Sequence, residues 1–395
     1  MATSITQPAA PIADARAHIP SLDGLRGIAI LFVMVHHYTI IEPASALDAA
    51  VVRYLTVGWA GVDLFFVLSG FLITGLLYDD RGAPGYFRRF YARRTLRIFP
   101  LYYLVVFLSL VVLPQCPDWY LLLVGPVDLA PVHEAAFWLY LSNVSIAMRE
   151  AFQHGILGVS WSLAIEEQFY LVWAPVVWWL GRRELVALSV ALIVAAPALR
   201  ALLLYADVHH VAVYVATPAR LDALATGALV ALVVRGPAGA VLGRWSLRAA
   251  VLLLGLVVAM VSWGDNNWWD GGITQRVGYT LIALAAGATV CHLVTSGASG
   301  RLARALSGGV LGTFGKYSYA LYLVHLPVMR MAREFVFDPR LAPAVGSSQL
   351  PAQALFYVVA GLPALALGWA SWRWFEEPIL RLKRHFPYGP SRTAG

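Results

Sequence analysis

An arginine and two histidines share the first apolar run of the chain, SLDGLRGIAILFVMVHHY at 21–38. Ionisable side chains are costly inside a membrane, so they usually mark a functional site. On a helix that turns 100° per residue, Arg26 and His37 lie about 20° apart on one face, whereas His36 points elsewhere. A rise of about 1.5 Å per residue places His37 about 16 Å deeper than Arg26. An imidazole at that depth is a candidate general base.

Two further apolar runs carry carboxylates near the predicted depth of His37. Asp63 stands in GVDLFFVLSGFLIT, and Glu166 and Glu167 stand in WSLAIEEQFYL. A carboxylate bonded to one imidazole nitrogen would fix the tautomer and raise the basicity of the other nitrogen. Asp63 and Glu166 both remain candidates for this contact. The alternative is that each acid pairs with a buried arginine or with backbone and holds the bundle together.

A cluster of cations lies at the start of the third predicted span, in YFRRFYARRTLRIFP at 86–100. Arg94 and Arg97 are three residues apart and share a helical face. Arginines at a helix N-terminus oppose the macrodipole unless an anion compensates them, and guanidinium groups bind phosphates well. Lys316, the second residue of the run GKYSYALYLVHLPV, is predicted near the same surface and is the third residue expected to bind the donor. The alternative for the arginines is a topology signal that contacts anionic lipid.

Three other polar residues of the predicted spans each allow two interpretations. His325 lies about 13 Å further into the membrane than Lys316. There it either lines the same cavity as His37 or hydrogen-bonds a neighbouring helix. Arg220 and Asp222, at the start of another run, either pair with each other or face the acceptor.

Composition indicates a membrane protein that crosses the bilayer many times. Of its 395 residues, 59% are hydrophobic and 13% are charged, against roughly 25% charged in a soluble domain. The net charge of +7 would suit nucleic acid, but basic residues at span ends already follow from membrane topology, so we expect no nucleic acid partner. The two cysteines, Cys116 and Cys291, favour neither a disulfide nor a metal site.

Apolar runs of about 17–25 residues predict an all-α transmembrane bundle of about ten spans. We place the spans near 22–41, 57–78, 98–114, 159–180, 185–204, 219–235, 249–263, 277–296, 310–333 and 353–375. The shorter run 135–147 is expected to lie along the interface or to re-enter the membrane. Lys and Arg collect in alternate loops, which predicts that both termini are cytoplasmic. The expected domains are tails at 1–20 and 379–395 and a transmembrane domain at 21–378.

In their order and spacing, six motifs between about residues 18 and 384 resemble the bacterial membrane acyltransferase family 3. They are SLDGLRGIAILFVMVHHY, GVDLFFVLSGFLIT, RRTLRIFP, WSLAIEEQFYL, GKYSYALYLVHLPV and WRWFEEPILR. The resemblance implies that Arg26 and His37 are required for transfer. It also implies that Arg94 and Arg97 handle the acyl donor, and that Glu166 is the acid of the WSL motif.

The resemblance further implies the reaction and its setting. Such proteins move an acetyl or other short acyl group from cytoplasmic acyl-CoA to a hydroxyl of a surface polysaccharide, a lipid-linked sugar or a glycolipid. Acetyl-CoA is the expected donor, with no metal, in the multi-pass setting of the bacterial inner membrane. Polysaccharide assembly machinery or a second copy of the chain are the expected partners. The chain ends soon after its last predicted span, which resembles the standalone type without an extracytoplasmic hydrolase-like domain.

Within this hypothesis, CoA phosphates lie against Arg94 and Arg97, with Arg26 as a further candidate contact. His37 takes a proton from the acceptor hydroxyl. Asp63 or Glu166 orients the imidazole, and direct transfer and an acyl-histidine intermediate both stay open. An alternative acceptor is a small hydroxylated metabolite such as a macrolide. A rival function is transport of a lipid-linked sugar, with the same histidine and acids as a proton relay. Transport would leave the arginine cluster unexplained.

Overall fold

The computed structural model describes residues 18–388 except 128, 153, 264–271 and 299. These residues form helices and no β-strand, apart from one isolated bridge between Val345 and Ser348. The prediction of an all-α fold is therefore confirmed. Most of the predicted tail at 1–20 and part of the tail at 379–395 lie outside the described residues.

A long helix stands at each predicted span, and shorter helices connect them. The long helices are α1 Pro20–Tyr38, α3 Ala60–Asp79, α4 Tyr86–Phe107, α8 Ser160–Trp179, α9 Arg182–Tyr205, α11 Thr217–Val234, α12 Gly239–Trp263, α13 Tyr279–Ser296, α15 Gly309–Phe335 and α16 Leu350–Ser371. The shorter helices are α2 Ala46–Leu55, α5 Pro117–Leu123, α6 Pro131–Trp138, α7 Ser142–Arg149, α10 His210–Val215, α14 Arg301–Leu306 and α17 Glu377–Leu380.

Seven helical stretches of the described chain are long and apolar enough to cross a membrane, so the protein is an integral membrane protein. They are Ala46–Asp79, Tyr86–Gln115, Arg182–Tyr205, His210–Val234, Gly239–Trp263, Thr274–Ser296 and Leu350–His385. Three long helices, α1, α8 and α15, fall outside this set. Helix α1 carries Arg26 and His37, α8 carries Glu166 and Glu167, and α15 carries Lys316 and His325. Such residues lower the hydropathy of a helix. Ten crossings with both termini in the cytoplasm therefore stay a prediction.

Two predicted segments have different bounds in the structure. The run 135–147 is divided between α6 and α7, eight residues each, and a helix of that length is about 12 Å long, too short to cross. The third span begins at Tyr86, twelve residues earlier than expected. Arg94 and Arg97 therefore stand inside α4, beyond the first turn to which the macrodipole effect is confined. The dipole argument for an anion at these arginines is wrong.

Close helix pairs form the centre of the bundle. Helix α1 packs along α15, and α3 packs along α11. A Cβ atom on Gly70 would overlap the backbone of Leu224, and one on Gly227 would overlap the backbone of Val67. These glycines let the α3 and α11 backbones touch, as small residues do between membrane helices. The close packing of α3 against α11 thus fixes the two helices that carry Asp63 and Arg220.

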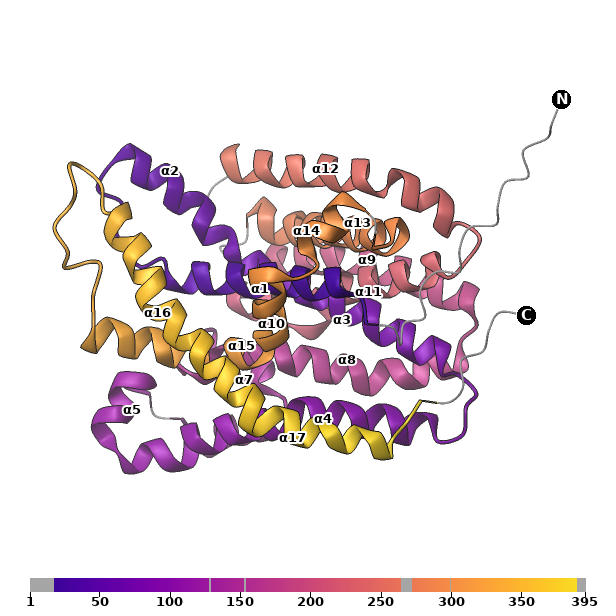
Figure 1. Ribbon diagram of the computed structural model, residues 1–395, viewed down its shortest axis with the longest axis horizontal. Helices are drawn as coiled ribbons and strands as arrows, with labels where there is room; N and C mark the ends of the chain where they lie inside the picture. Colours follow the sequence, from indigo (N-terminus) through magenta and orange to yellow (C-terminus); the bar gives the residue numbers. More distant parts are fainter. Residues whose placement is uncertain (1–17, 128, 153, 264–271, 299, 389–395) are drawn as a thin grey trace.

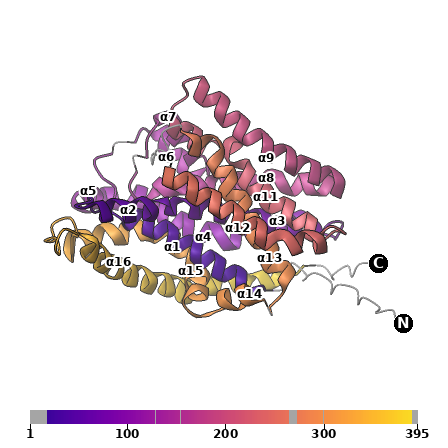
Figure 2. The same ribbon diagram turned by 90° about the horizontal axis from the view of Figure 1, so that it is seen from above.

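The remaining helices surround this centre. Figure 1 shows α4, α8 and α12 running roughly parallel, with α16 crossing obliquely. In Figure 2, seen from above, α9 follows one outer edge of the molecule and α16 the opposite edge. Both views place α2 and α5 at the same end of the bundle. Residues of the first turns of α1 and α15, among them Pro20, Asp23 and Gly312, line one cavity together with the cations of the sequence motifs.

Candidate active site

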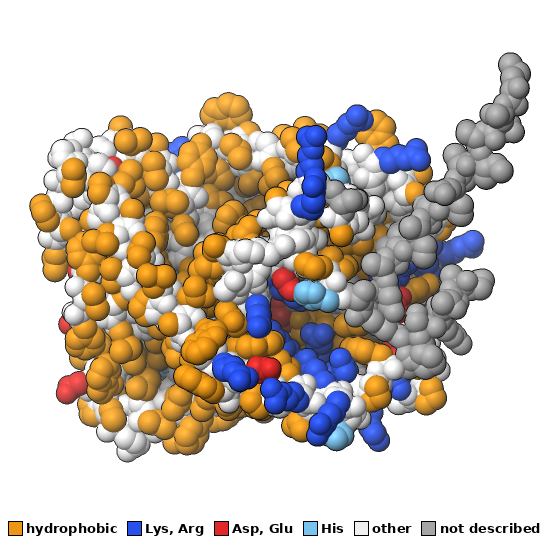
Figure 3. Space-filling view, in the orientation of Figure 1, with side chains coloured by type: hydrophobic (Ala, Val, Ile, Leu, Met, Phe, Trp, Pro, Cys, Tyr) orange, Lys and Arg blue, Asp and Glu red, His pale blue; other side chains and the backbone are white. Residues whose placement is uncertain are grey.

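A cavity of about 780 Å³ lies between α1, α3, α4, α8 and α15. Figure 3 shows Lys and Arg side chains gathered around a hollow in the right half of the molecule, whereas the left half is mostly hydrophobic. Five cations line the cavity: Arg26, Arg94, Arg97, Lys316 and Lys383. Its volume lies within the range of roughly 300–1,000 Å³ that is typical of small-molecule sites. The structure therefore brings all three predicted donor-binding residues to one cavity, together with Arg26.

Carboxylates balance only part of this positive charge. Asp23 accepts from Arg26 at 2.7 Å, and Glu376 lies 3.3 Å from the Arg97 guanidinium. In contrast, the Nε atom of Arg94 is buried with no hydrogen-bond partner among the described residues. A buried guanidinium N–H without a partner is costly, so it favours an incoming acceptor such as a phosphate oxygen.

Lys383 is a cavity residue that the sequence analysis missed. It stands in a short helical turn, Arg381–His385, after the last long helix. A second hollow of about 300 Å³ shares Arg26, Arg94 and Lys383 with the main cavity. The basic surface therefore continues outward from the main cavity. The only sequence signal for Lys383 is its place in the basic run RLKRH, which the topology argument already explained.

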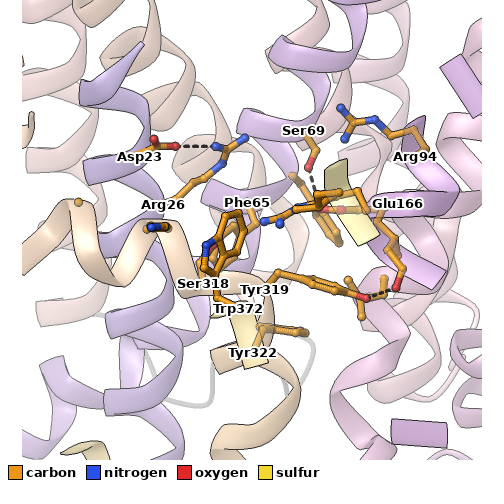
Figure 4. A pocket seen from close by; sticks show the side chains of 18 of the residues that line it. Asp23, Arg26, Phe65, Ser69, Arg94, Glu166, Ser318, Tyr319, Tyr322 and Trp372 are labelled. Atoms are coloured by element: carbon orange, nitrogen blue, oxygen red, sulfur yellow. Dashed lines mark hydrogen bonds and ion pairs between the residues drawn. The ribbon is translucent and has the colours of Figure 1, made fainter. Parts of the chain in front are cut away.

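Glu166 faces the cavity from the middle of α8. Its carboxylate accepts from the Ser69 hydroxyl at 2.9 Å, a contact marked by a dashed line in Figure 4. It also accepts from the Tyr170 hydroxyl at 2.8 Å. All three residues line the cavity. The first acid of the WSL motif thus lies on the same cavity as Arg26 and Arg94, and its carboxylate bonds to two hydroxyls.

His37 lies outside the cavity lining, in the last turn of α1. Its Nδ1 is 2.9 Å from the Val33 carbonyl oxygen and 3.3 Å from Nε2 of His325. Nδ1 of His325 lies 2.9 Å from the Tyr322 carbonyl and 3.1 Å from that of Leu321. Carbonyl oxygens only accept, so both Nδ1 atoms must donate. This tautomer leaves the lone pair of His37 on Nε2, as a general base requires.

The sequence allowed two interpretations of His325, a place in the cavity lining or a hydrogen bond to a neighbouring helix, and the structure shows the second. His325 is fully buried on α15 and hydrogen-bonds a neighbouring helix through His37. It does not line the cavity described above. The partner of His37 is therefore an imidazole 288 positions away in the sequence. The two acids expected there bond to other residues: Asp63 to Arg220, and Glu166 to Ser69 and Tyr170.

Asp63 takes part in a buried network of charges. Its Oδ1 lies 2.7 Å from the Arg220 guanidinium, and both side chains are fully buried. Asp222 instead lies 3.0 Å from Arg200. Of the two interpretations of Arg220 and Asp222, the mutual pair is wrong, because residues two apart on a helix do not face each other. For Asp63, the structure matches the alternative of an ion pair that holds the bundle together, and places no contact to His37.

A glutamine fixes the end of α1 that carries the histidines. Gln353 of α16, 1% exposed, accepts from the backbone N–H groups of Ile40 and Ile41 at 3.0 and 3.3 Å and donates to the Tyr38 carbonyl at 2.8 Å. The Tyr38 hydroxyl in turn donates to the His325 carbonyl at 3.2 Å. Gln353 thus satisfies backbone groups where α1 ends. No motif marks this residue in the sequence.

The fold and the cavity define a class of protein: a helical membrane enzyme with a basic cavity next to a histidine pair. The family model described as "Acyltransferase domain" matches residues 19–373, so the chain belongs to the membrane acyltransferase family 3 and is an acyltransferase. No solved structure matches the chain significantly.

Curated relatives include the O-acetyltransferase OatA of Staphylococcus aureus strain NCTC 8325 / PS 47 and that of strain COL. Each is 28% identical over 385 residues, which cover 92% of this chain and 57% of the relative. The chain thus spans little more than half the length of these relatives.

Proposed function

We propose that the chain is an O-acyltransferase that moves an acetyl or other short acyl group from acyl-CoA to a hydroxyl of a cell-surface polysaccharide, a lipid-linked sugar or a glycolipid. Its expected setting is the bacterial inner membrane. The observation that carries the proposal is the cavity in which Arg26, Arg94, Arg97, Lys316 and Lys383 converge. The name of the relative OatA, an O-acetyltransferase, supports oxygen as the acceptor atom.

Coenzyme A matches the charge of the cavity. Its phosphates are anions that guanidinium groups bind in a bidentate manner. Arg94 offers a buried N–H without a partner among the described residues, and Lys316 lines the same cavity from α15. In this proposal the phosphates stay among the cations and the pantetheine arm extends toward the inner end of the cavity.

His37 acts as the general base in this proposal. Its Nε2 takes the proton of the acceptor hydroxyl while the hydroxyl oxygen forms a bond to the thioester carbonyl carbon. The carbon–sulfur bond then breaks, and the leaving thiolate of coenzyme A receives the proton that His37 Nε2 took up, which restores the neutral imidazole. His325 accepts from His37 Nδ1–H and so holds the tautomer that the step needs. Glu166, bonded to Ser69 and Tyr170, faces the donor side.

Incubation of the purified protein with acetyl-CoA labelled on the acetyl group tests the proposal. Candidate acceptors are lipid-linked sugars, polysaccharide fragments, glycolipids and, as the second candidate class, small hydroxylated metabolites such as macrolides. Label in a hydroxyl ester together with release of free CoA supports acyl transfer and identifies the acceptor class. Binding of these sugars without any esterified product would contradict it and favour transport.

A further inference from the structure

The cavity changes from charged to apolar along its length. Arg94 and Lys316 line it at the basic end, whereas Val62, Phe65 and Tyr322 line it further in. On α15, Tyr322 stands six residues after Lys316, or about 9 Å deeper. Figure 4 shows Tyr322 at the lower edge of the view, away from Asp23 and Arg94 at the top. Phe66 and Leu163 complete this apolar inner end.

Hydrogen bonds and ring contacts fix the wall of the inner end. The Tyr322 hydroxyl lies 2.6 Å from the Ser162 hydroxyl and 3.1 Å from the Val159 carbonyl. The Phe65 ring meets the Tyr322 ring edge to face, with centroids 6.2 Å apart. Tyr322 is only 5% exposed. A tyrosine held at both its ring and its hydroxyl does not move aside without losing these contacts.

The histidine pair lies directly behind this wall. The Tyr322 and His325 ring centroids are 6.0 Å apart, and those of His325 and His37 are 5.0 Å apart. The apolar inner end is thus the part of the cavity that adjoins the histidine pair. In the proposed function, the acyl group of the thioester occupies this end of the cavity.

We propose that Phe65 and Tyr322 set the longest acyl group that the enzyme transfers, because they close the inner end of the cavity as a small apolar chamber. The inference rests on the proposed function, in which acyl-CoA binds with its phosphates at the cations. A short acyl group fits between the rings and the neighbouring Val62 and Leu163 side chains. A longer chain meets the fixed Tyr322 ring.

The physical basis is the cost of one additional methylene in a closed apolar pocket. Differences of one methylene change selectivity by about 10- to 200-fold where the walls are rigid. Removal of one aromatic ring from the wall leaves an empty space in the enzyme, which costs packing energy. A longer acyl chain fills that space and recovers part of this energy, whereas an acetyl group does not. The expected result is a change in the ratio between substrates rather than a general loss of activity.

Competition between acetyl-CoA and butanoyl-CoA tests the inference with the full-length protein in detergent or nanodiscs. We expect Phe65→Ala to raise the ratio of butanoyl to acetyl transfer by about tenfold or more. Phe65→Leu removes less volume and is expected to raise the ratio less. Tyr322→Leu, which shortens the end wall, should act in the same direction. Phe107→Ala, at a side chain of α4 that is exposed outside the cavity, is the matched control and should leave the ratio unchanged.

The outcomes of this competition experiment distinguish a failure of the inference from a failure of the proposed function. An unchanged ratio in a monodisperse Phe65→Ala protein that still transfers acetyl groups would overturn the inference and leave the proposed function intact. Wild-type protein that transfers no acyl group from any CoA thioester would overturn both. If Phe65→Ala does not fold, the folded Phe65→Leu protein decides, since an unchanged ratio there also overturns the inference.

Discussion

His37 Nδ1 lies 3.3 Å from His325 Nε2, which joins the end of α1 to the middle of α15 through two imidazoles. Both rings also contact backbone carbonyls of their own helices. Because those carbonyls only accept, the contacts select one neutral tautomer for each ring. A histidine pair thus takes the place that a carboxylate–histidine contact was expected to fill.

Replacement of the His37 imidazole is expected to abolish transfer. His37→Ala removes the only Nε2 that the proposed mechanism uses, and loss of a general base typically lowers kcat by about 10²- to 10⁴-fold. The measurement is the rate of acetyl transfer by purified protein. His36→Ala is the matched control, because its ring points to the Thr56 carbonyl and lies off the face of His37. Wild-type activity of a folded His37→Ala protein would refute the mechanism.

The partner imidazole is expected to act through His37. His325→Leu removes the acceptor for His37 Nδ1–H, so we expect kcat to fall by about tenfold or more while KM for acetyl-CoA stays the same. His325→Gln supplies an amide oxygen as an acceptor and should retain more activity than His325→Leu. Equal losses in the two variants, or a change confined to KM, would count against a positioning role.

The paired arginines are expected to govern donor binding. Substitution of Arg94 and Arg97 by Gln removes charge-assisted hydrogen bonds worth about 1.5–3 kcal/mol each, so KM for acetyl-CoA should rise by at least tenfold. KM for the acceptor should change little. Arg88→Gln, on the same helix but outside the cavity lining, serves as the control. An unchanged KM for acetyl-CoA in the double variant would return both arginines to the topology interpretation.

The buried pair of Asp63 and Arg220 is expected to control stability. Asp63→Asn leaves a fully buried guanidinium without its counter-charge, a change that costs about 3–5 kcal/mol. The variant should therefore unfold at a lower temperature in a thermal stability assay. Combination with Arg220→Gln should recover part of the loss, because the unpaired charge is then gone. A stable but inactive Asp63→Asn protein would instead favour a catalytic role for this acid.

Sequence patterns predicted the helices and the cation cluster because both are local properties. Apolar runs show where a helix stands, and a spacing of three residues put Arg94 and Arg97 on one face. Depth along a helix, however, says nothing of which neighbour the side chain faces. Its predicted depth made Asp63 a candidate partner of His37, but its carboxylate pairs with Arg220 on α11.

The contacts that position the candidate base depend on tertiary packing. His325 and Gln353 come from α15 and α16, far from α1 in the sequence, and nothing local to α1 indicates which helices adjoin it. Lys383 follows the last long helix, where a basic residue is already expected from topology. The three-dimensional structure is therefore needed to assign His325, Gln353 and Lys383 to the candidate site.

The two described ends of the chain meet at the outer hollow, which His18, Lys383 and Tyr388 line together. Arg93 reinforces this meeting point by donating to the carbonyls of Lys383 and Phe386. Segments that precede His18 or follow Tyr388 are therefore joined to the described residues beside this hollow. Affinity tags for the kinetic experiments need cleavable linkers at both ends, and the rates should be measured after cleavage.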